Sequence, residues 1–212
     1  MNEAVFAAEA TRLTPIEAVE VTHDTGAISL LLAAEAAGGL NETIANDTAV
    51  LLERLVGASD VVLLTCSTLG PAAAIAAQRT GKPVLRVDGA LAEAAVAAGS
   101  RILVLYAVAT TLAPTRALFG AAAEGRDVSI DYRLVEGAWA LMRAGDVEGY
   151  HRAIAAAADA AQSEVHRAPY DVVALAQASM SGAAAFTRVA RPMTSPAAGL
   201  AAAIAAVKGK RA

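Results

Sequence analysis

The hydrophobic positions of this chain gather into two kinds of segment that alternate along its length. Short runs rich in β-branched residues predict strands, and two of them, VVLLT and RILVLYAV, are apolar throughout. Such runs are typical of parallel strands that are covered on both faces. Longer alanine-rich segments with helical spacing lie between these runs. The alternation predicts an α/β fold with parallel sheets and right-handed crossovers.

The pattern gives limits for each expected element. Strands are expected at residues 18–22, 60–65, 83–87, 101–108, 128–135, 171–176 and 192–194. Helices are expected at residues 2–12, 27–37, 41–56, 71–79, 90–98, 114–123, 147–165, 182–189 and 196–207.

Two stretches of the chain resemble each other. DVVLLTCSTLGPAAAIA begins at Asp60, and DVVALAQASMSGAAAFT begins at Asp171, 111 residues later. Each is followed by a short strand and a helix, which predicts an internal duplication, although chance similarity in a chain so rich in alanine and valine is the alternative. We therefore expect lobes at residues 1–98 and 99–194, followed by a C-terminal helix and tail at 195–212.

The two halves differ at their beginnings. The second half opens with the strong strand expected at 101–108, whereas the first half opens directly with a helix. The first lobe is therefore expected to lack its first strand. Either the lobe omits that strand or the chain begins late, and we favour the late start.

Composition and charge narrow the function classes. Of 212 residues, 56% are hydrophobic and 18% are charged, which is typical of a globular protein. The net charge is −4, and the one basic cluster, KGKR, lies at the C-terminus, so nucleic-acid binding is disfavoured. The N-terminus lacks the pattern of a signal peptide, and no apolar run is long enough for a membrane span. These features favour a soluble cytoplasmic protein.

The single cysteine, Cys66, is the first candidate for chemistry. It follows the strand VVLLT directly, and open parallel sheets bind ligands at this end of their strands. Ser67, Thr68 and Pro71 predict a helix start with a hydroxyl cap. Because a helix N-terminus favours thiolates and bound anions, the turn suits a thiol that acts beside a carboxylate. The alternative is packing, since free cysteine is among the most buried residue types.

Other polar residues also follow expected strands. By the repeat, Gln177 corresponds to Cys66, and two lobes face to face would set these two residues on opposite sides of one cleft. The remaining candidates are Ser179, Thr110, Thr111, His23 and Asp24. Hydroxyls and carboxylates at such positions are also common as caps of turns and helices, which is the alternative. No spacing of a metal site and no glycine-rich nucleotide motif occurs, so neither a metal nor a cofactor is expected.

Three motifs together resemble those of the aspartate/glutamate/hydantoin racemase superfamily, which includes maleate isomerases and arylmalonate decarboxylases. They are TCSTLGPA after one strand, ALAQASM after another, and the closing PMTSPAAGL. The resemblance covers essentially the whole chain. It implies two flavodoxin-like lobes with the active site between them and no metal or organic cofactor. Racemases of this family use one cysteine per lobe; Cys66 matches the first, whereas Gln177 stands at the second and cannot exchange protons at neutral pH.

We therefore expect a cofactor-independent enzyme that acts on a small carboxylate or amino-acid-like substrate, with Cys66 as its only thiol. Reactions in which a single group transfers a proton at one face of the substrate are favoured. They are decarboxylation with protonation, isomerisation through a thioether, or a lyase step. In this hypothesis Gln177 donates an amide hydrogen bond, and the carboxylate is bound by Ser67, Thr68, Thr110, Thr111 and Ser179. Asp24 is a further candidate for substrate binding. The alternatives are an amino-acid racemase with a second base such as His23, and a non-catalytic carboxylate binder. The helix expected at 27–37 lacks an obvious polar face, so a homo-oligomer is a further possibility.

Overall fold

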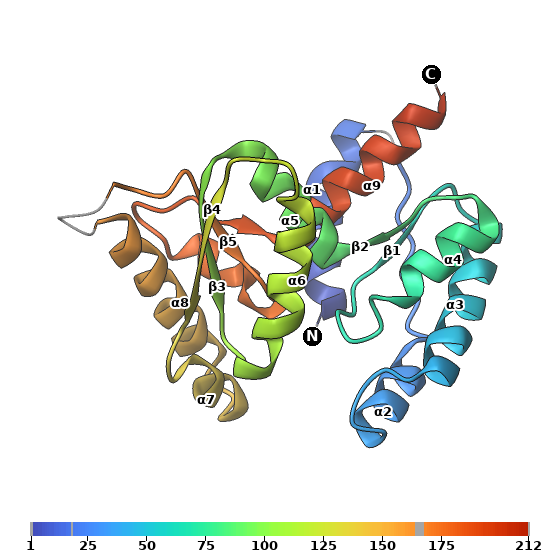
Figure 1. Cartoon of the computed structure of the whole chain (residues 1–212), viewed down its shortest axis with the longest axis horizontal. Helices are drawn as coiled ribbons and strands as arrows, with labels where there is room; N and C mark the ends of the chain where they lie inside the picture. Colours follow the sequence, from blue (N-terminus) through green and yellow to red (C-terminus); the bar gives the residue numbers. More distant parts are fainter. Residues whose placement is uncertain (1, 18, 164–167, 212) are drawn as a thin grey trace. The chain divides into compact units, whose positions relative to one another are not determined.

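The computed structural model describes residues 2–17, 19–163 and 168–211 (Figure 1). By their contacts, these residues form two compact units. The N-terminal unit comprises Asn2–Val87 together with the chain from Gly199 onward, and the C-terminal unit comprises Asp88–Ala198. The lobe limits expected from the sequence at residues 98 and 194 stay a prediction.

The C-terminal unit is built on a four-stranded parallel sheet with the strand order β4-β3-β5-β6. Its strands are β3 (Arg101–Tyr106), β4 (Ser129–Leu134), β5 (Val172–Leu175) and β6 (Met193–Thr194). Its helices are α5 (Val87–Ala98), α6 (Leu112–Ala122), α7 (Ala138–Arg143) and α8 (Val147–Gln162), with the 3-10 helices η1 (Ala109–Thr111) and η2 (Ala178–Ala185). The two central strands, β3 and β5, are apolar and buried, as their sequence predicts.

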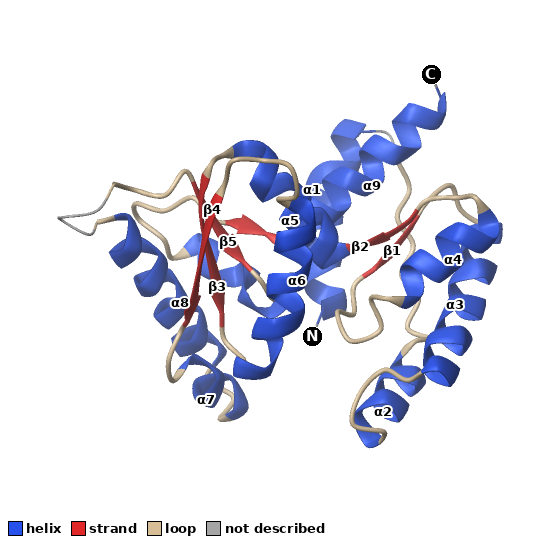
Figure 2. Cartoon of the chain, in the orientation of Figure 1, coloured by secondary structure: helices blue, strands red, loops and turns tan. Residues whose placement is uncertain are grey.

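Alternate residues of β3 enter two different cores. Leu103 and Leu105 pack with Ile154 of α8, whereas Ile102 and Val104 pack with residues of α5 and α6. Helices therefore cover both faces of the sheet, α7 and α8 on one side and α5 and α6 on the other (Figure 2). This burial on both faces explains why the strand lacks polar residues in its interior.

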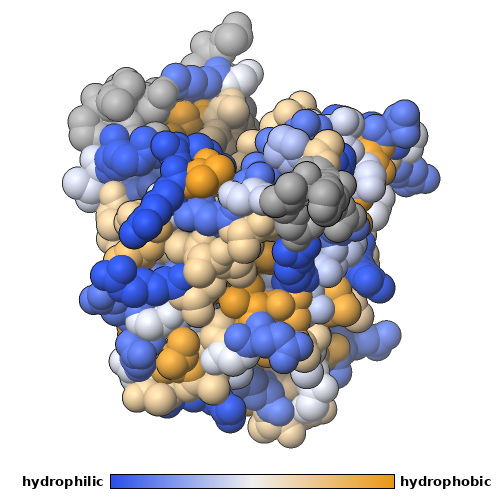
Figure 3. Space-filling model, turned by 90° about the vertical axis from the view of Figure 1, so that its left-hand side faces the viewer, coloured by the Kyte–Doolittle hydropathy of each residue, from blue (hydrophilic) through white to orange (hydrophobic). Residues whose placement is uncertain are grey.

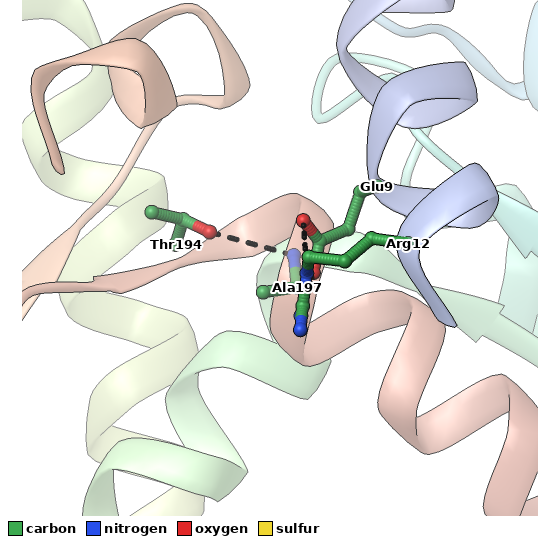
Figure 4. Close-up of polar contacts among 4 residues, drawn as sticks. All are labelled: Glu9, Arg12, Thr194 and Ala197. Atoms are coloured by element: carbon green, nitrogen blue, oxygen red, sulfur yellow. Dashed lines mark hydrogen bonds and ion pairs between the residues drawn. The ribbon is translucent and has the colours of Figure 1, made fainter. Parts of the chain in front are cut away.

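The N-terminal unit holds a two-stranded parallel sheet. Its elements are α1 (Asn2–Glu17), α2 (Ile28–Ala36), α3 (Glu42–Gly57), β1 (Val62–Leu64), α4 (Ala72–Thr80), β2 (Val84–Arg86) and the greater part of α9 (Ser195–Arg211). Val62, Leu64 and Val84 share a core with α3 and α4. Leu63 points to the other face, where a Cβ added to Gly199 of α9 would lie 3.1 Å from its Cδ2 atom. On α1, Glu9 and Arg12 form an ion pair (Figure 4).

The strand expected at residues 18–22 is wrong for the part that the structure describes. Residues 19–25 have no regular secondary structure, and Ala18 lies outside the described residues. Val19 and Val21 are half-buried and Glu20 is exposed, so the alternation typical of a strand is present. No neighbouring strand pairs with this segment among the described residues, and β propensity alone does not make a strand.

The helix expected at residues 182–189 is also wrong. The 3-10 helix η2 ends at Ala185, and a loop follows it. The carboxylate of Asp159 on α8 accepts hydrogen bonds from the backbone N–H groups of Arg188, Val189 and Ala190 at 2.8, 2.9 and 2.8 Å. These bonds hold the loop away from helical geometry. The helix expected at 147–165 ends at Gln162, and residues 164 and 165 lie outside the described part of the chain.

The order of elements is similar in the two stretches that resemble each other. β1 pairs with β2 in parallel, as β5 pairs with β6. Within the described residues of the N-terminal unit, no strand corresponds to β3, in agreement with the expected lack of a first strand. The duplication itself stays a prediction.

The face of the molecule drawn in Figure 3 is mixed in polarity. On the face drawn in Figure 3, hydrophobic residues are interspersed with hydrophilic ones. On α2, Ile28 and Leu32 lie one turn apart and are 56% and 59% exposed, but the homo-oligomer that this helix suggests stays a prediction. None of the described helices combines the length and the apolar character that crossing a membrane requires.

Asp171 holds the starts of β3 and β5 together. Its carboxylate accepts hydrogen bonds from the backbone N–H groups of Arg101 at 2.8 Å and Ser100 at 2.9 Å, and from the Ser100 hydroxyl at 3.1 Å. These bonds, the Arg101 amide first, lower the pKa of Asp171 below its ordinary value. A Cβ at Gly99 would overlap the Asp171 side chain, so the carboxylate also needs the glycine beside it.

We expect Asp171→Asn to lower the melting temperature at neutral pH. Because the native pKa of Asp171 is lowered, its stabilisation is complete above the ordinary aspartate pKa of about 3.9 and is lost as the pH falls through the native pKa. The gap in melting temperature between the native chain and the variant should therefore close between pH 5 and pH 2, which thermal unfolding monitored by circular dichroism will measure. Asp127→Asn, an exposed aspartate before β4, is the control. A gap that does not change with pH would contradict this account.

Candidate functional site

Cys66 lies in the turn between β1 and α4. It is a half-buried free thiol that packs at the edge of the core of the N-terminal unit. The turn is closed by a hydrogen bond from the N–H group of Gly70 to the carbonyl oxygen of Ser67 at 3.2 Å. The side chains of Ser67 and Thr68 are exposed. The thiol therefore lies at the boundary between the core and the surface, next to two exposed hydroxyls.

The hydroxyl cap expected at the start of α4 is not formed. Pro71 is the N-cap residue, with helical φ and ψ of −57° and −27°, and no described side chain accepts a capping hydrogen bond there. The helix is instead initiated by two backbone bonds, from Ala72 N–H to Leu69 O and from Ala73 N–H to Gly70 O, each 3.0 Å long. The hydroxyls of Ser67 and Thr68 are thus not used as caps of α4.

Arg86, which sequence reasoning missed, lies against the same turn. It is the last residue of β2 and is paired in register with Leu64 of β1. A Cβ added to Gly70 would lie 2.5 Å from the Cζ and Nη2 atoms of Arg86, so the half-buried guanidinium occupies the space beside that glycine. The sequence feature that could have pointed to Arg86 is its place as the charged residue in the otherwise apolar run PVLRV.

Gln177 joins the ends of two strands in the C-terminal unit. Its Oε1 atom accepts a hydrogen bond from the N–H group of Ala107, after β3, at 2.9 Å. Its Nε2 atom donates to the Thr111 hydroxyl at 2.7 Å, and that hydroxyl donates to Val108 O at 2.6 Å. The amide oxygen and one amide N–H are therefore engaged within the protein, and any ligand would use the second N–H.

Ser179 is anchored by α8. Its Oγ atom lies 3.0 Å from the Oη atom of Tyr150, and its carbonyl oxygen lies 3.0 Å from Nε2 of His151. Burial raises the pKa of Tyr150, while the hydrogen bond with Ser179 opposes this shift. The His151 ring also stacks on Phe186, with an interplanar angle of 28°. Tyr150 and His151 were not candidates, because only the tertiary fold brings them to Ser179.

Asp24 takes part in a local turn. Its Oδ1 atom accepts a hydrogen bond from Gly26 N–H at 2.8 Å, just before α2, and its side chain is exposed. His23 is exposed as well. This geometry agrees with the alternative that Asp24 is a cap, and a role in substrate binding stays a prediction.

The closing motif PMTSPAAGL forms β6 and the start of α9. The Thr194 hydroxyl accepts a hydrogen bond from Ala197 N–H at 3.4 Å (Figure 4). Ser195 is buried, and its hydroxyl has no hydrogen-bond partner among the described residues. The motif thus begins the helix through Thr194.

The structure brings the candidates together in two groups. Cys66, Ser67 and Thr68 form one turn of the N-terminal unit, with Arg86 beside it. In the C-terminal unit, Gln177 is hydrogen-bonded to Thr111, and Ser179 follows in η2; Thr110 is exposed in η1. The placement of Cys66 opposite Gln177 stays a prediction. No described cluster of His, Cys, Asp and Glu side chains is arranged to hold a metal ion.

We expect Gln177→Ala to destabilise the chain by about 1–3 kcal/mol, because the Ala107 N–H group loses its acceptor in a half-buried place. Urea unfolding of the full chain measures this difference. Gln78→Ala, which removes an exposed glutamine from α4, is the matched control and should change the free energy of unfolding by less than about 0.5 kcal/mol. Equal stabilities of the two variants would show that Gln177 does not hold the strand ends.

Comparison with known proteins gives matches in structure only. No protein-family model matches the sequence, and no curated protein does. A glutamate racemase isoform from Bacillus anthracis is 13% identical, with a TM-score of 0.59 over 99% of this chain and 79% of that chain. Glutamate racemase from Thermus thermophilus, solved with β-chloro-D-alanine, is 15% identical, with a TM-score of 0.54 over 99% and 78%.

A third similar structure is a glycine-to-cysteine variant of arylmalonate decarboxylase in its sulfate-associated form. It is 19% identical, with a TM-score of 0.52 over 79% of this chain and 74% of that chain. At these identities the likeness concerns the fold. The chain therefore has the two-lobe α/β fold of glutamate racemase and arylmalonate decarboxylase, which confirms the fold expected from the resemblance to their superfamily.

Proposed function

We propose that the chain is a cofactor-independent enzyme of the racemase and decarboxylase kind, acting on a small carboxylate with Cys66 as its only thiol. The observation that carries this proposal is the turn after β1, where a half-buried thiol lies next to the exposed side chains of Ser67 and Thr68. The similar structures support it, since they are racemases and a decarboxylase, one of them associated with sulfate.

The thiol supplies the proton chemistry. As a thiolate, Cys66 removes a proton from the carbon next to a carboxylate; as a thiol, it delivers a proton to the carbanion left when carbon dioxide departs, and the thiolate then regains a proton from water. In both cases negative charge develops on the carboxylate oxygens. The hydroxyls of Ser67 and Thr68 stabilise this charge, as fixed donors at a developing oxyanion do.

The chemistry is one-sided in this proposal. The amide of Gln177 neither accepts nor releases protons at neutral pH, and its oxygen is engaged by Ala107. Because the sequence holds one cysteine, the proposal gives one face of the substrate a thiol acid or base and the opposite face no thiol. Decarboxylation with protonation, isomerisation through a thioether and a lyase step all satisfy this condition.

We expect Cys66→Ser to lower turnover by about 10²–10⁴-fold, the usual contribution of general acid–base catalysis, without loss of folding. The assay is the exchange of carbon-bound protons in deuterium oxide, followed by NMR with aspartate and glutamate of both hands, and carbon dioxide release from phenylmalonate. Ser163→Ala, an exposed serine at the end of α8, is the control and should keep the native rate.

Three outcomes would contradict the proposal in different ways. Native turnover in Cys66→Ser would remove the thiol from the mechanism. Exchange from both enantiomers at similar rates would indicate a two-base racemase. Ligand-induced thermal stabilisation without exchange or carbon dioxide release would indicate a binding protein.

A further inference from the structure

We propose that the outer edge of β4 pairs with β4 of a second copy of this chain. The two strands run antiparallel and are centred on Tyr132, so that the sheets of two C-terminal units join into one. The inference concerns the C-terminal unit alone, which contains the whole of β4. It does not depend on the reaction proposed for the turn after β1.

β4 is the edge strand of its sheet. In the strand order β4-β3-β5-β6, its neighbour is β3, and no strand pairs with its other side among the described residues. The register with β3 runs without interruption from Ser129 to Leu134, so no bulge bends the strand away from a partner. The strand also contains neither proline nor glycine. β4 therefore presents a regular edge six residues long.

The backbone groups of β4 point alternately toward β3 and away from it. The N–H group of Ser129 donates to the carbonyl oxygen of Ser100, on the β3 side, at 2.7 Å, so the odd-numbered residues of β4 face β3. The even-numbered residues, Ile130, Tyr132 and Leu134, direct their N–H and C=O groups outward. Within the described parts of the chain, no hydrogen bond reaches these outward backbone groups. They are the groups with which an added strand would pair.

The side chains of β4 complement those of the same strand turned end to end. In IDYRL, Tyr132 is central, an acidic and a basic residue flank it, and an apolar residue lies at each end. A twofold axis at Tyr132 sets Asp131 opposite Arg133 of the second copy, and Ile130 opposite Leu134. Opposite charges and apolar pairs that face each other across antiparallel strands stabilise their pairing. A twofold axis repeats each of these pairs, and it closes the assembly as a dimer.

The charges also select the register. Antiparallel pairing about position 131 would set Asp131 against its own copy, and pairing about position 133 would do the same with Arg133. Like charges that face each other destabilise a strand pair. Pairing about Tyr132 avoids both and engages all the outward backbone groups of Ile130, Tyr132 and Leu134.

Charged side chains on an edge strand often prevent association, but β4 carries one charge of each sign. A second copy therefore meets attraction where a strand of one sign would meet repulsion. Asp131 and Arg133 both have interactions within the chain, and the Asp131 carboxylate accepts a hydrogen bond from the Tyr170 hydroxyl at 2.6 Å. The proposed pairing keeps these interactions, because the backbone makes the new hydrogen bonds and the charges only set the register.

The first measurement is the oligomeric state of the full chain. Sedimentation equilibrium should give a mass that rises with concentration toward twice the 21.3 kDa of one chain. Hydrogen–deuterium exchange followed by mass spectrometry locates the interface. Exchange should slow in the peptide that contains β4 as the dimer forms, whereas peptides of α2 should keep their rate.

Charge reversal tests the register. Arg133→Glu gives β4 two negative charges and Asp131→Lys gives it two positive ones, so each variant alone should self-associate at least about tenfold more weakly than the native chain. Mixing the two variants should restore association, because each then meets the opposite charges. Arg126→Glu, at an exposed residue before β4, is the control and should keep the native affinity. Thermal unfolding checks that each variant is folded.

Two results with the native chain would overturn the inference. The first is a single-chain mass at every concentration at which the protein stays in solution. The second is a dimer in which exchange at β4 does not slow, because another surface, such as α2, would then form the interface. Charge variants that associate as the native chain does, with no preference for each other, would overturn the centring on Tyr132.

Discussion

Parallel pairing of neighbouring strands is the constraint on which both candidate turns depend. The pairing of β3 with β5 ends both strands at one edge, and so does the pairing of β1 with β2. Ladder hydrogen bonds stop at such an edge, so the residues that follow must satisfy the backbone in another way. In the C-terminal unit the side chain of Gln177 does this by accepting from Ala107. In the N-terminal unit the turn after β1 is closed by its own backbone.

The central strands could be predicted from the sequence because strands that are buried on both faces have an apolar composition. β3 and β5 have helices on both faces, so nearly every position is apolar and the pattern is unambiguous. The segment at 19–22 has similar residues but lacks a paired neighbour among the described residues. The segment after η2 has helical spacing, yet it is held by Asp159, 31 residues before Ala190. Both failures concern partners that are distant in the chain: the first segment lacks one among the described residues, and the second is held by one.

The same distinction explains which candidates the sequence could supply. Cys66, Ser67 and Gln177 follow their strands directly, so position along the chain is enough to find them. Arg86 reaches Gly70 only through the register of two strands, and Tyr150 reaches Ser179 across 29 residues. Local sequence motifs do not reveal which residues contact a neighbouring strand or helix. The expected hydroxyl cap failed for a related reason, because backbone bonds already begin α4.

The two turns differ in how much of their bonding capacity is already used. Gln177 and Thr111 bond to each other and to backbone groups, and Ser179 lies against Tyr150, so the turn after β5 is largely satisfied within the protein. At the turn after β1, by contrast, the side chains of Ser67 and Thr68 are exposed and cap no helix. A group that already has partners must break them to meet a ligand, whereas an exposed hydroxyl exchanges only water. On the proposed function, the turn after β1 therefore carries the reaction, and the turn after β5 maintains the shape of its strand ends. These separate roles agree with a chain that has a single thiol.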